Sequence, residues 1–468
     1  MKVLFYSLSL FFIFFSVSCS SKKNSASLHS LVSTQIKNDS TITFFGKLYV
    51  KKTIEASSLL KTDFIGSIIQ NELNDFSSGI NTNKPVYFTV HGLLHKQGFP
   101  EEVTIYSELK SKDSLCDKIS SLGYFLKHKE GISFVEKPLF SILINDDVAL
   151  FHYGKPIGLK KLQQKMTASE EVAKPISINI DKSLKSTSFI SLTAHLKNIH
   201  VLQSKMSSLS PKNQGAIEAL LSDAFLSATV VDKLNEFQVN IAHLFSEKLK
   251  NKCFLTSGDF IKLDDAMYNS HCTYHFDPVK ADAFIATYYP EFLEKIIGSR
   301  IELQFALLSL GKSPIASLTN GNGSVSFGLT DAMAFNCFSL CNEFDENKSI
   351  TKIIYSSLPA LLGSRFSTSE TGNKFFLKSS NQGCSLKSNK LPSDFGIKGV
   401  DFYYVPSQQT KSESGFTALL RENSSFVRIQ VSNDDSKIII RGKNKNKTMC
   451  EQVVDYFMNQ YTSGNLSI

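Results

Sequence analysis

Short runs in which hydrophobic and polar residues alternate recur along most of the chain, and stretches rich in Gly, Asn, Asp and Ser separate them. Alternation is typical of strands with one buried face, because successive side chains point to opposite sides of a sheet. The pattern predicts strands over residues 41–50, 85–90, 103–109, 132–135 and 139–153 (two strands), another from residue 189, one near residue 334, and a hairpin over residues 426–441.

Apolar residues spaced three and four positions apart predict helices between these strands. The expected helices cover residues 54–76, 113–122, 158–165, 349–362 and 450–461, the first of them broken near Asp63. Residues 168–183 are polar and contain a proline, which indicates a connector. Hairpins interspersed with helices indicate an α+β fold with mostly antiparallel sheets packed by helices.

Two segments share the order strand, Asn-Asp-Asp, strand at similar spacing: SILINDDVALFHY (141–153) and RIQVSNDDSKIII (428–440). We interpret this echo as a sign of two or three repeated α+β modules. The acidic pairs are Asp146 and Asp147 in the first segment, and Asp434 and Asp435 in the second. Adjacent carboxylates suit a hard cation such as Ca²⁺, but further oxygen ligands are missing. A tight hairpin turn is therefore the favoured interpretation, since Asn and Asp tolerate a positive φ.

The start of the chain differs from the rest. Met1 and Lys2 form a short basic start, and residues 3–17 are an apolar run. As a helix this run is about 22 Å long, short of the ~30 Å bilayer core, so we interpret it as a signal peptide rather than a membrane anchor. Small residues then precede Cys19. The pattern resembles the bacterial lipoprotein signal, in which the cysteine becomes the first mature residue and carries acyl chains such as palmitate.

The residues after the cysteine bear on location. Ser20 follows Cys19, where many inner-membrane lipoproteins have Asp, and an acidic cluster resembling a surface-export signal is missing. The resemblance therefore implies an outer-membrane anchor with the body facing the periplasm, the cell surface being the alternative. The Ser-rich residues 19–40 are expected to form a flexible tether.

Composition narrows the classes of function. The 468 residues are 42% hydrophobic, and their net charge of +8 is mild for this length, so we expect no nucleic-acid partner. The length predicts about three domains or two large ones. The 37 Phe residues indicate hydrophobic cores, and the lack of Trp weakens a glycan-binding role.

Motifs for catalysis and metal binding are scarce. The sequence contains no G-x-S-x-G and no H-E-x-x-H, which removes two common hydrolase signatures. His91 and His95 lie four residues apart, as do His271 and His275, a spacing that suits zinc on a helix. Both pairs fall in or beside expected strands, where that spacing separates residues by about 13 Å. We therefore expect no metal, no cofactor and no catalytic residue.

Seven cysteines remain besides Cys19, an odd number that cannot pair completely within the chain. They are Cys116, Cys253, Cys272, Cys337, Cys341, Cys384 and Cys450. A bridge between Cys253 and Cys272, which flank a helix-like turn, is the favoured pairing. Free thiols in the core are the alternative, because unpaired Cys is often buried.

Three short motifs lie in the body of the chain. Ser78-Gly79-Ile80 leads into Lys84-Pro85-Val86-Tyr87 at a strand start, Asn145-Asp146-Asp147 marks a hairpin, and a small-residue turn precedes the apolar strand at 323–328. With the lipoprotein signal, these motifs resemble an uncharacterised lipoprotein family of Bacteroidota, a domain of unknown function. The resemblance covers most of the mature chain and implies an envelope location and α+β architecture. It implies no reaction and no catalytic residues.

These expectations divide the chain into six parts. They are a signal peptide over 1–18, acylated Cys19 with its tether over 19–40, a module over 41–170, a connector over 171–186, and modules over 187–330 and 331–468. We expect a non-enzymatic binding or scaffolding protein, bound to the membrane through the lipid on Cys19 and to an envelope protein or glycan. An envelope hydrolase with an unrecognised Ser or carboxylate site is the alternative, because catalytic residues meet in space from distant positions. The sequence leaves the oligomeric state open.

Overall fold

The computed structural model describes about 70% of the chain. The described residues are 28–57, 67, 70–71, 78–94, 100–154, 157–166, 176–185, 188–199, 211–259, 261, 268–290, 310–311, 313–329, 335–362, 366–379, 391–406 and 423–462. Among them, no helix is both long enough and apolar enough to cross a bilayer.

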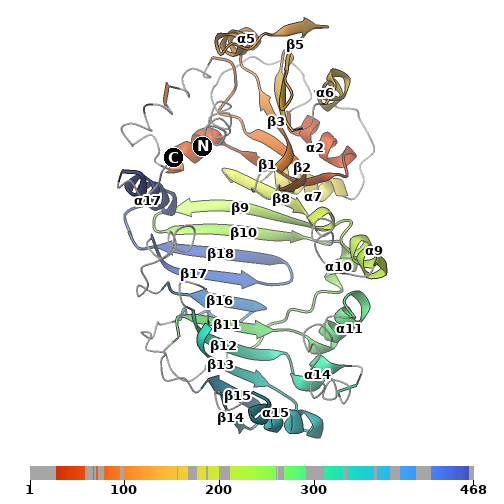
Figure 1. Cartoon of the computed structure of the whole chain (residues 1–468), viewed down its shortest axis with the longest axis vertical. Coiled ribbons are helices and arrows are strands. Elements are labelled where there is room, and N and C mark those ends of the chain that lie inside the picture. Colours follow the sequence, from red (N-terminus) through yellow and green to blue (C-terminus); the bar gives the residue numbers. More distant parts are fainter. Residues whose placement is uncertain are drawn as a thin grey trace. The chain divides into compact units, whose positions relative to one another are not determined.

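The chain divides into two compact units. Unit 1 comprises Met1–Ser208, Leu221–Asp232 and Cys450–Ile468, and unit 2 comprises Leu209–Leu220 and Lys233–Met449. Each unit combines helices with antiparallel strands, so the expected α+β class is confirmed (Figure 1). Unit 2 covers most of what the sequence pattern divides between a second and a third module.

The described residues of unit 1 form nine strands, all paired in antiparallel fashion. Its strands are β1 (Ile42–Leu48), β2 (Val86–Leu94), β3 (Pro100–Glu108), β4 (Lys127–Lys129), β5 (Ile132–Glu136), β6 (Phe140–Ile144), β7 (Val148–Tyr153), β8 (Ile190–His195) and β9 (Phe225–Lys233). Its helices are α2 (Leu28–Asn38), α3 (Val50–Ser57), α5 (Lys112–Ser121), α6 (Leu159–Met166), α7 (Ile176–Lys185) and α17 (Met449–Thr462). The spatial order of the strands is β9-β8-β1-β2-β3-β7-β6-β5-β4.

The two faces of this sheet differ in chemistry. On one face α5 packs on β5, β6 and β7 through a hydrophobic cluster that includes Leu115, Ile119, Val135, Ile144 and Phe151. On the other face α2 and α7 pack together over β1 and β3, and that face carries buried hydroxyl and imidazole groups such as Thr89, Thr104, His152 and Thr193. The alternation of side chains along β3 and β7 produces this division.

Residues 28–38, expected to belong to the tether, instead form α2, so that part of the expectation is wrong. Leu31, Val32 and Ile36 are buried on one side of the helix. Their spacing is helical, but the Ser, Thr and His residues between them lower the overall hydrophobicity of the segment. Any tether between Cys19 and the folded unit is therefore limited to residues 20–27.

The connector expected over residues 171–186 is also wrong for its second half, because α7 covers Ile176–Lys185. Ile180 and Leu184 are both about 1% exposed and lie four residues apart on one face of the helix. The polar residues between them mask this short amphipathic pattern. The helix expected over residues 54–76 lies mostly outside the described residues, and its first residues belong to α3, which begins at Val50. The other predicted elements that fall on described residues are found within a few residues of their expected bounds.

In the part of unit 2 that the structure describes there are also nine strands with antiparallel pairing. They are β10 (Glu236–Leu244), β11 (Ser270–His275), β12 (Asn322–Leu329), β13 (Phe335–Glu343), β14 (Phe366–Thr371), β15 (Lys374–Ser379), β16 (Val400–Tyr404), β17 (Ser424–Val431) and β18 (Asp435–Gly442). Its helices are α9 (Pro211–Leu220), α10 (Glu247–Lys250), α11 (Pro278–Tyr288), α14 (Pro314–Leu318) and α15 (Ser349–Leu362). The strand order is β10-β18-β17-β16-β11-β12-β13-β15-β14, with α9, α11 and α14 beside one end of the strands (Figure 1).

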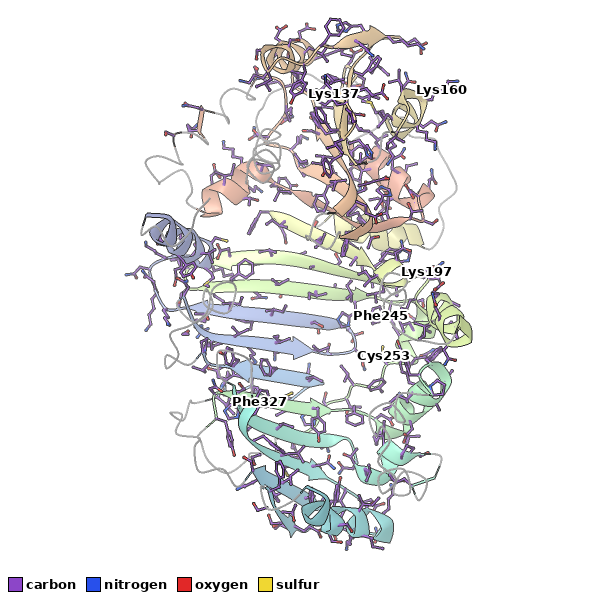
Figure 2. The ribbon with its side chains drawn as sticks, in the orientation of Figure 1. Lys137, Lys160, Lys197, Phe245, Cys253 and Phe327 are labelled. Atoms are coloured by element: carbon purple, nitrogen blue, oxygen red, sulfur yellow. The ribbon has the colours of Figure 1, made fainter. Side chains whose placement is uncertain are left out.

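The expected Cys253–Cys272 disulfide is wrong, since both cysteines are free thiols. Leu255 pairs with Phe276, which lies four residues beyond Cys272. Cys253 lies on the side of this pairing away from Cys272, so about 13 Å or more separates the two cysteines, which is beyond disulfide distance. Cys253 is labelled in Figure 2. Burial raises the pKa of Cys272 to about 11, so its thiol stays protonated at neutral pH.

A buried ion pair holds the middle of unit 2 together. The Arg428 guanidinium donates to both carboxylate oxygens of Asp401, from Nε at 3.0 Å and from Nη2 at 2.7 Å. Both residues are buried. Arg428 also donates to the Asp394 carboxylate at 2.9 Å, and this contact lowers the pKa of Asp394. Asp401 further accepts from the backbone N–H of Gly396, which fixes the loop before β16.

Removing the negative charge of Asp401 should strongly destabilise unit 2. The Asp401→Asn substitution leaves Arg428 charged and buried without its main partner, at an expected cost of about 3–5 kcal/mol in the free energy of unfolding. Asp394→Asn is the matched control, because that side chain is 67% exposed and its loss should cost less than about 1 kcal/mol. Urea unfolding followed by circular dichroism measures both values. Equal losses in the two variants would contradict this account.

Candidate functional site

Unit 1 has an open hollow of about 800 Å³ between α5 and the β4–β5 hairpin, in the part of the unit drawn at the top of Figure 1. Its lining mixes apolar and polar side chains. The lining residues include Lys112, Asp117, Ser120, Tyr124, Phe125 and His128. Such a mixture can hold a ligand by apolar contact and orient it by hydrogen bonds.

Local sequence signals set the walls of the hollow. The Ser111 hydroxyl caps α5 by accepting from the backbone N–H of Ser114 at 3.2 Å. At the other end of the helix Gly123 has a φ of +84°, which lets the chain turn sharply toward β4. Gly131, with a φ of +77°, makes the turn between β4 and β5. These two glycines occupy backbone positions that other residues adopt only at a cost.

Polar contacts inside the hollow brace its walls. The Lys112 ammonium donates to the Gly131 carbonyl at 2.5 Å and to Asp146 at 3.0 Å, and so ties the start of α5 to two turns of the sheet. The His128 Nδ1 and the Ser133 hydroxyl lie 3.0 Å apart across the hairpin. These groups position the walls of the hollow.

Four large apolar side chains are exposed at one end of this part of the sheet, and we call them the apolar rim. They are Leu122 (43% exposed), Phe125 (81%), Leu139 (64%) and Tyr153 (45%). The pairing of Lys127 with Phe134 places Phe125 at the end where β5 finishes and β6 begins. Tyr153 pairs with Phe140 at that same end. Lys137, labelled in Figure 2, lies in the turn beside them.

The neighbours of Phe125 are well packed. Leu126 is buried in the α5 cluster, and the Tyr124 ring packs edge-on against Phe140 with 5.5 Å between centroids. Phe125 therefore projects from an anchored segment. Because Phe residues were expected to lie in cores, the sequence pattern missed this position.

A second group of polar side chains lies on the other face of unit 1's sheet. The His91 Nδ1 is 3.1 Å from the Thr41 hydroxyl and 3.5 Å from the Asp39 carboxylate. Thr41 donates its single hydroxyl proton to Asp39 at 2.6 Å. His91 Nδ1 must therefore be the donor to Thr41, which places the proton of the neutral ring on Nδ1.

This polar cluster extends to β3, β7 and α6. The Thr104 hydroxyl is 3.1 Å from Nδ1 of His152 and accepts from the Lys165 ammonium at 3.4 Å. Burial lowers the pKa of Lys165, and Asp39 and Glu102 oppose that change. The residues are far apart in sequence, so no local motif could have found the cluster. Its contacts join the end of α2 to β2, β3, β7 and α6.

The sequence-predicted positions have varied outcomes. Cys19 and His95 lie outside the described residues. His271 contacts the Ser326 hydroxyl at 2.8 Å, and Nε2 of His275 contacts the Gly396 carbonyl at 2.7 Å. Among the described residues, no group of three or more His, Cys, Asp or Glu side chains is arranged to hold a metal ion.

Both Asn-Asp-Asp segments form hairpin turns, as favoured from the sequence. The turn between β6 and β7 is closed by Asn145, whose side chain accepts from the backbone N–H groups of Asp147 and Val148. In the turn between β17 and β18, the Ser432 hydroxyl contacts the Asp435 carboxylate at 2.5 Å. Neither turn directs its carboxylates toward a common point with other acidic side chains among the described residues.

Comparison with known proteins gives little further information. No protein-family model matches the chain, and no curated protein matches it. One solved structure that matches is described as "Structure of crystal form I of TP0453"; it is 12% identical, with a TM-score of 0.29, and the match covers 48% of this chain and 81% of that chain. At that TM-score the similarity supports no conclusion about fold or function.

The polar cluster predicts how stability depends on pH. Burial lowers the pKa of His91 from its ordinary value of 6.5; Lys165 and His152 lower it further, and Asp39 and Glu102 oppose this. The unfolded chain therefore binds a proton at a higher pH than the folded chain. The contribution of His91 to the free energy of unfolding should be constant above about pH 7 and fall as the pH drops through the region below 6.5. Burial lowers the pKa of His29, His195 and His271 as well, so their contributions have the same sign.

Urea unfolding at a series of pH values tests this prediction. The His91→Gln variant removes one titrating group, so its free energy of unfolding should fall less steeply below pH 6.5 than that of the wild-type protein. Above about pH 7 the difference in free energy of unfolding between the two proteins should stay constant. An identical slope for both proteins, or a gain of stability in acid, would contradict it.

Proposed function

We propose that the protein is a lipid-anchored envelope lipoprotein that binds a partner through the hollow and the apolar rim of unit 1. Its signal peptide covers residues 1–18, and Cys19 carries the lipid at the periplasmic face of the outer membrane. The partner is an envelope protein or glycan, and the role is binding or scaffolding rather than catalysis. The proposal includes membership of the Bacteroidota lipoprotein family that the motifs resemble.

The exposure of Phe125 is the observation that carries the binding role. Single exposed apolar residues are common on protein surfaces. Here a Phe that is 81% exposed stands with Leu139 and Tyr153 at one end of the sheet, beside a hollow that contains hydrogen-bonding groups. Clustered apolar residues of this kind mark interaction sites, and aromatic residues often dominate binding energy.

We also propose that the two units are copies of one architecture, which is the repeated-module hypothesis in a two-copy form. In unit 1, β1 pairs with β2 and β8, β2 with β3, and β8 with β9. In unit 2, β11 pairs with β12 and β16, β12 with β13, and β16 with β17. A helix follows the third strand of each set, α5 after β3 and α15 after β13.

A matching side-chain contact supports the two-copy proposal. Asn81 donates to Glu108 twice, from its backbone N–H to the carbonyl at 2.8 Å and from its amide to the carboxylate at 2.9 Å. Asn320 makes the same two contacts with Glu343, at 2.9 and 3.1 Å. In both units the Asn precedes the second strand and the Glu ends the third.

The two-copy proposal supports a binding role for the hollow. In unit 1 the strand that pairs with β3 is β7, and β4, β5 and β6 lie between α5 and β7 in the chain. In unit 2 the strand that pairs with β13 is β15, and β14 lies between α15 and β15. The strands β4 and β5 are thus an addition to unit 1, and they form one wall of the hollow. An addition to a shared architecture is a natural place for a specific binding site, because the central strands stay unchanged.

An envelope hydrolase with an unrecognised Ser or carboxylate site stays as the second candidate. The contact between Asp39 and His91 is the observation that favours it, because a carboxylate beside a histidine supplies two of the three groups of a catalytic triad. The hydroxyl next to this histidine belongs to Thr41, which donates its proton to Asp39. The histidine therefore does not activate that hydroxyl, and binding is the stronger proposal.

Capture of crosslinked partners from cell envelopes tests the binding role. Phe125→Ser should reduce recovery of a specific partner at least tenfold, since a central aromatic residue of an interface commonly contributes about 2 kcal/mol or more. Ile353→Ser is the matched control, because Ile353 is 59% exposed on α15 of unit 2, and it should leave recovery unchanged. Cys19→Ala shows whether capture needs the anchor. Equal recovery of the partner by the Phe125→Ser variant and by the wild-type protein would contradict the proposal.

A further inference from the structure

One end of unit 1's sheet is rich in lysine. The strand β1 finishes there, beside the start of β2, because Leu48 pairs with Val86. On its other edge Leu48 pairs with Ile190, so the start of β8 lies at the same end. The first turn of α3 and the last turn of α7 adjoin these strand ends in the chain. We call this surface the basic end.

The segments that meet at the basic end carry five lysines and one acidic residue, Glu55, within residues 47–57, 83–87 and 184–190. Four of the lysines are exposed: Lys51, Lys52, Lys84 and Lys185. On the neighbouring strand β3, Glu108 ends at the same side, where its carboxylate accepts from the Asn81 amide at 2.9 Å, and Lys112 pairs with Asp146 at 3.0 Å. The exposed lysines around the end of β1 and the starts of β2 and β8 still outnumber the acidic side chains of these segments.

Lys47, the fifth lysine, has a structural role. It is buried, and its ammonium donates to the carbonyl of Leu184 in the last turn of α7. Its charge lies 5.6 Å from the centre of the Tyr49 ring, and the Lys52 ammonium lies 4.7 Å from the same ring. These contacts hold α7 and the start of α3 against the end of β1, so the exposed lysines project from a fixed surface.

The helix α2 begins at this same end. The His29 ring lies 6.2 Å from the Tyr87 ring at the start of β2. At the other end of α2, Asp39 lies 3.5 Å from His91, near the far end of β2. The helix thus runs from the basic end toward the opposite end of the strands.

Covalent geometry then limits how far the basic end can lie from a lipid on Cys19. Residues 20–27 separate Cys19 from α2, and a fully extended chain of that length spans about 30 Å at most. The apolar rim lies at the opposite end of the strands, where Tyr153 pairs with Phe140. A membrane on the side of Cys19 would therefore meet the lysines and leave the rim free.

We propose that the basic end of unit 1 docks on anionic lipid head groups of the membrane that holds the Cys19 lipid. Lysine side chains attract the phosphates of such head groups, and the attraction is additive and salt-dependent. The proposal rests on acylation of Cys19, as in the proposed function. It adds an orientation of unit 1 on the membrane: the lysines of the basic end face the lipid, and the apolar rim faces away from the lipid toward a partner.

Vesicle sedimentation with the mature chain, residues 19–468 carrying Cys19→Ser, tests the docking without any contribution from the lipid. The chain should bind vesicles that contain phosphatidylglycerol, should not bind vesicles of phosphatidylcholine alone, and should be released by salt. One variant combines four changes at the basic end: Lys51→Gln, Lys52→Gln, Lys84→Gln and Lys185→Gln. Its control removes the same charge elsewhere on unit 1: Lys127→Gln, Lys137→Gln, Lys160→Gln and Lys161→Gln (Lys137 and Lys160 are labelled in Figure 2).

Affinity for phosphatidylglycerol vesicles should fall at least tenfold in the basic-end variant and less than threefold in the control, with circular dichroism confirming that both fold. Absence of binding by the parent, or equal losses in the two variants, would overturn the docking proposal.

Detergent phase partition of the wild-type protein from cells reports separately on the lipid. Partition into the detergent phase together with failed vesicle binding overturns the docking and leaves the anchor standing. Vesicle binding that depends on the basic end, together with partition into the aqueous phase, supports the docking surface and overturns the proposed anchor.

Discussion

Each unit depends on one central strand whose backbone hydrogen bonds are completed on both edges by strands from distant parts of the chain. In unit 1, Phe45 of β1 pairs with Thr89 on one edge and with Thr193 on the other. A buried backbone group left without a partner costs about 1–3 kcal/mol, so the strand is stable only when both neighbours are in place. Gly46 allows the close approach, because a Cβ there would lie 2.1 Å from the Ser191 carbonyl oxygen. The same constraint applies to β11, whose Cys272 pairs with Val325 and Phe402.

Under the two-copy proposal, this constraint accounts for the place at which the two units differ. The central strands and the hairpins beside them keep the same pairing in both units, and the paired Asn and Glu contacts recur at the same place. The additional strands β4 and β5 lie at the outer edge of unit 1's sheet, where β4 pairs with β5. Strands at this position leave the central hydrogen bonds intact, and they form one wall of the hollow and position Phe125. Under the two-copy proposal, the proposed binding site can diverge without loss of the fold.

Prediction from the sequence succeeded where a pattern is local and strong. Residues 349–362 were expected to be helical and form α15, and the hairpin turn at Asn145 was recognised from its residue types. It failed for α2, whose buried apolar residues are separated by Ser, Thr and His. It could not identify Phe125 as exposed, since composition does not distinguish one Phe from another. The contact between Asp39 and His91 joins residues 52 positions apart, which no single sequence can reveal.

In the proposed arrangement a lipid is attached to Cys19, the basic end of unit 1 lies against the membrane, and the apolar rim faces a partner. The other two placements depend on the lipid, because residues 20–27 are the covalent link between a lipid on Cys19 and α2. Mass spectrometry of the N-terminal peptide from the membrane-extracted protein tests the lipid attachment most directly. The account predicts a mature chain that begins at Cys19 and carries the mass of a diacylglyceryl group on the thiol. A chain that begins elsewhere, or an unmodified cysteine at this position, would contradict it.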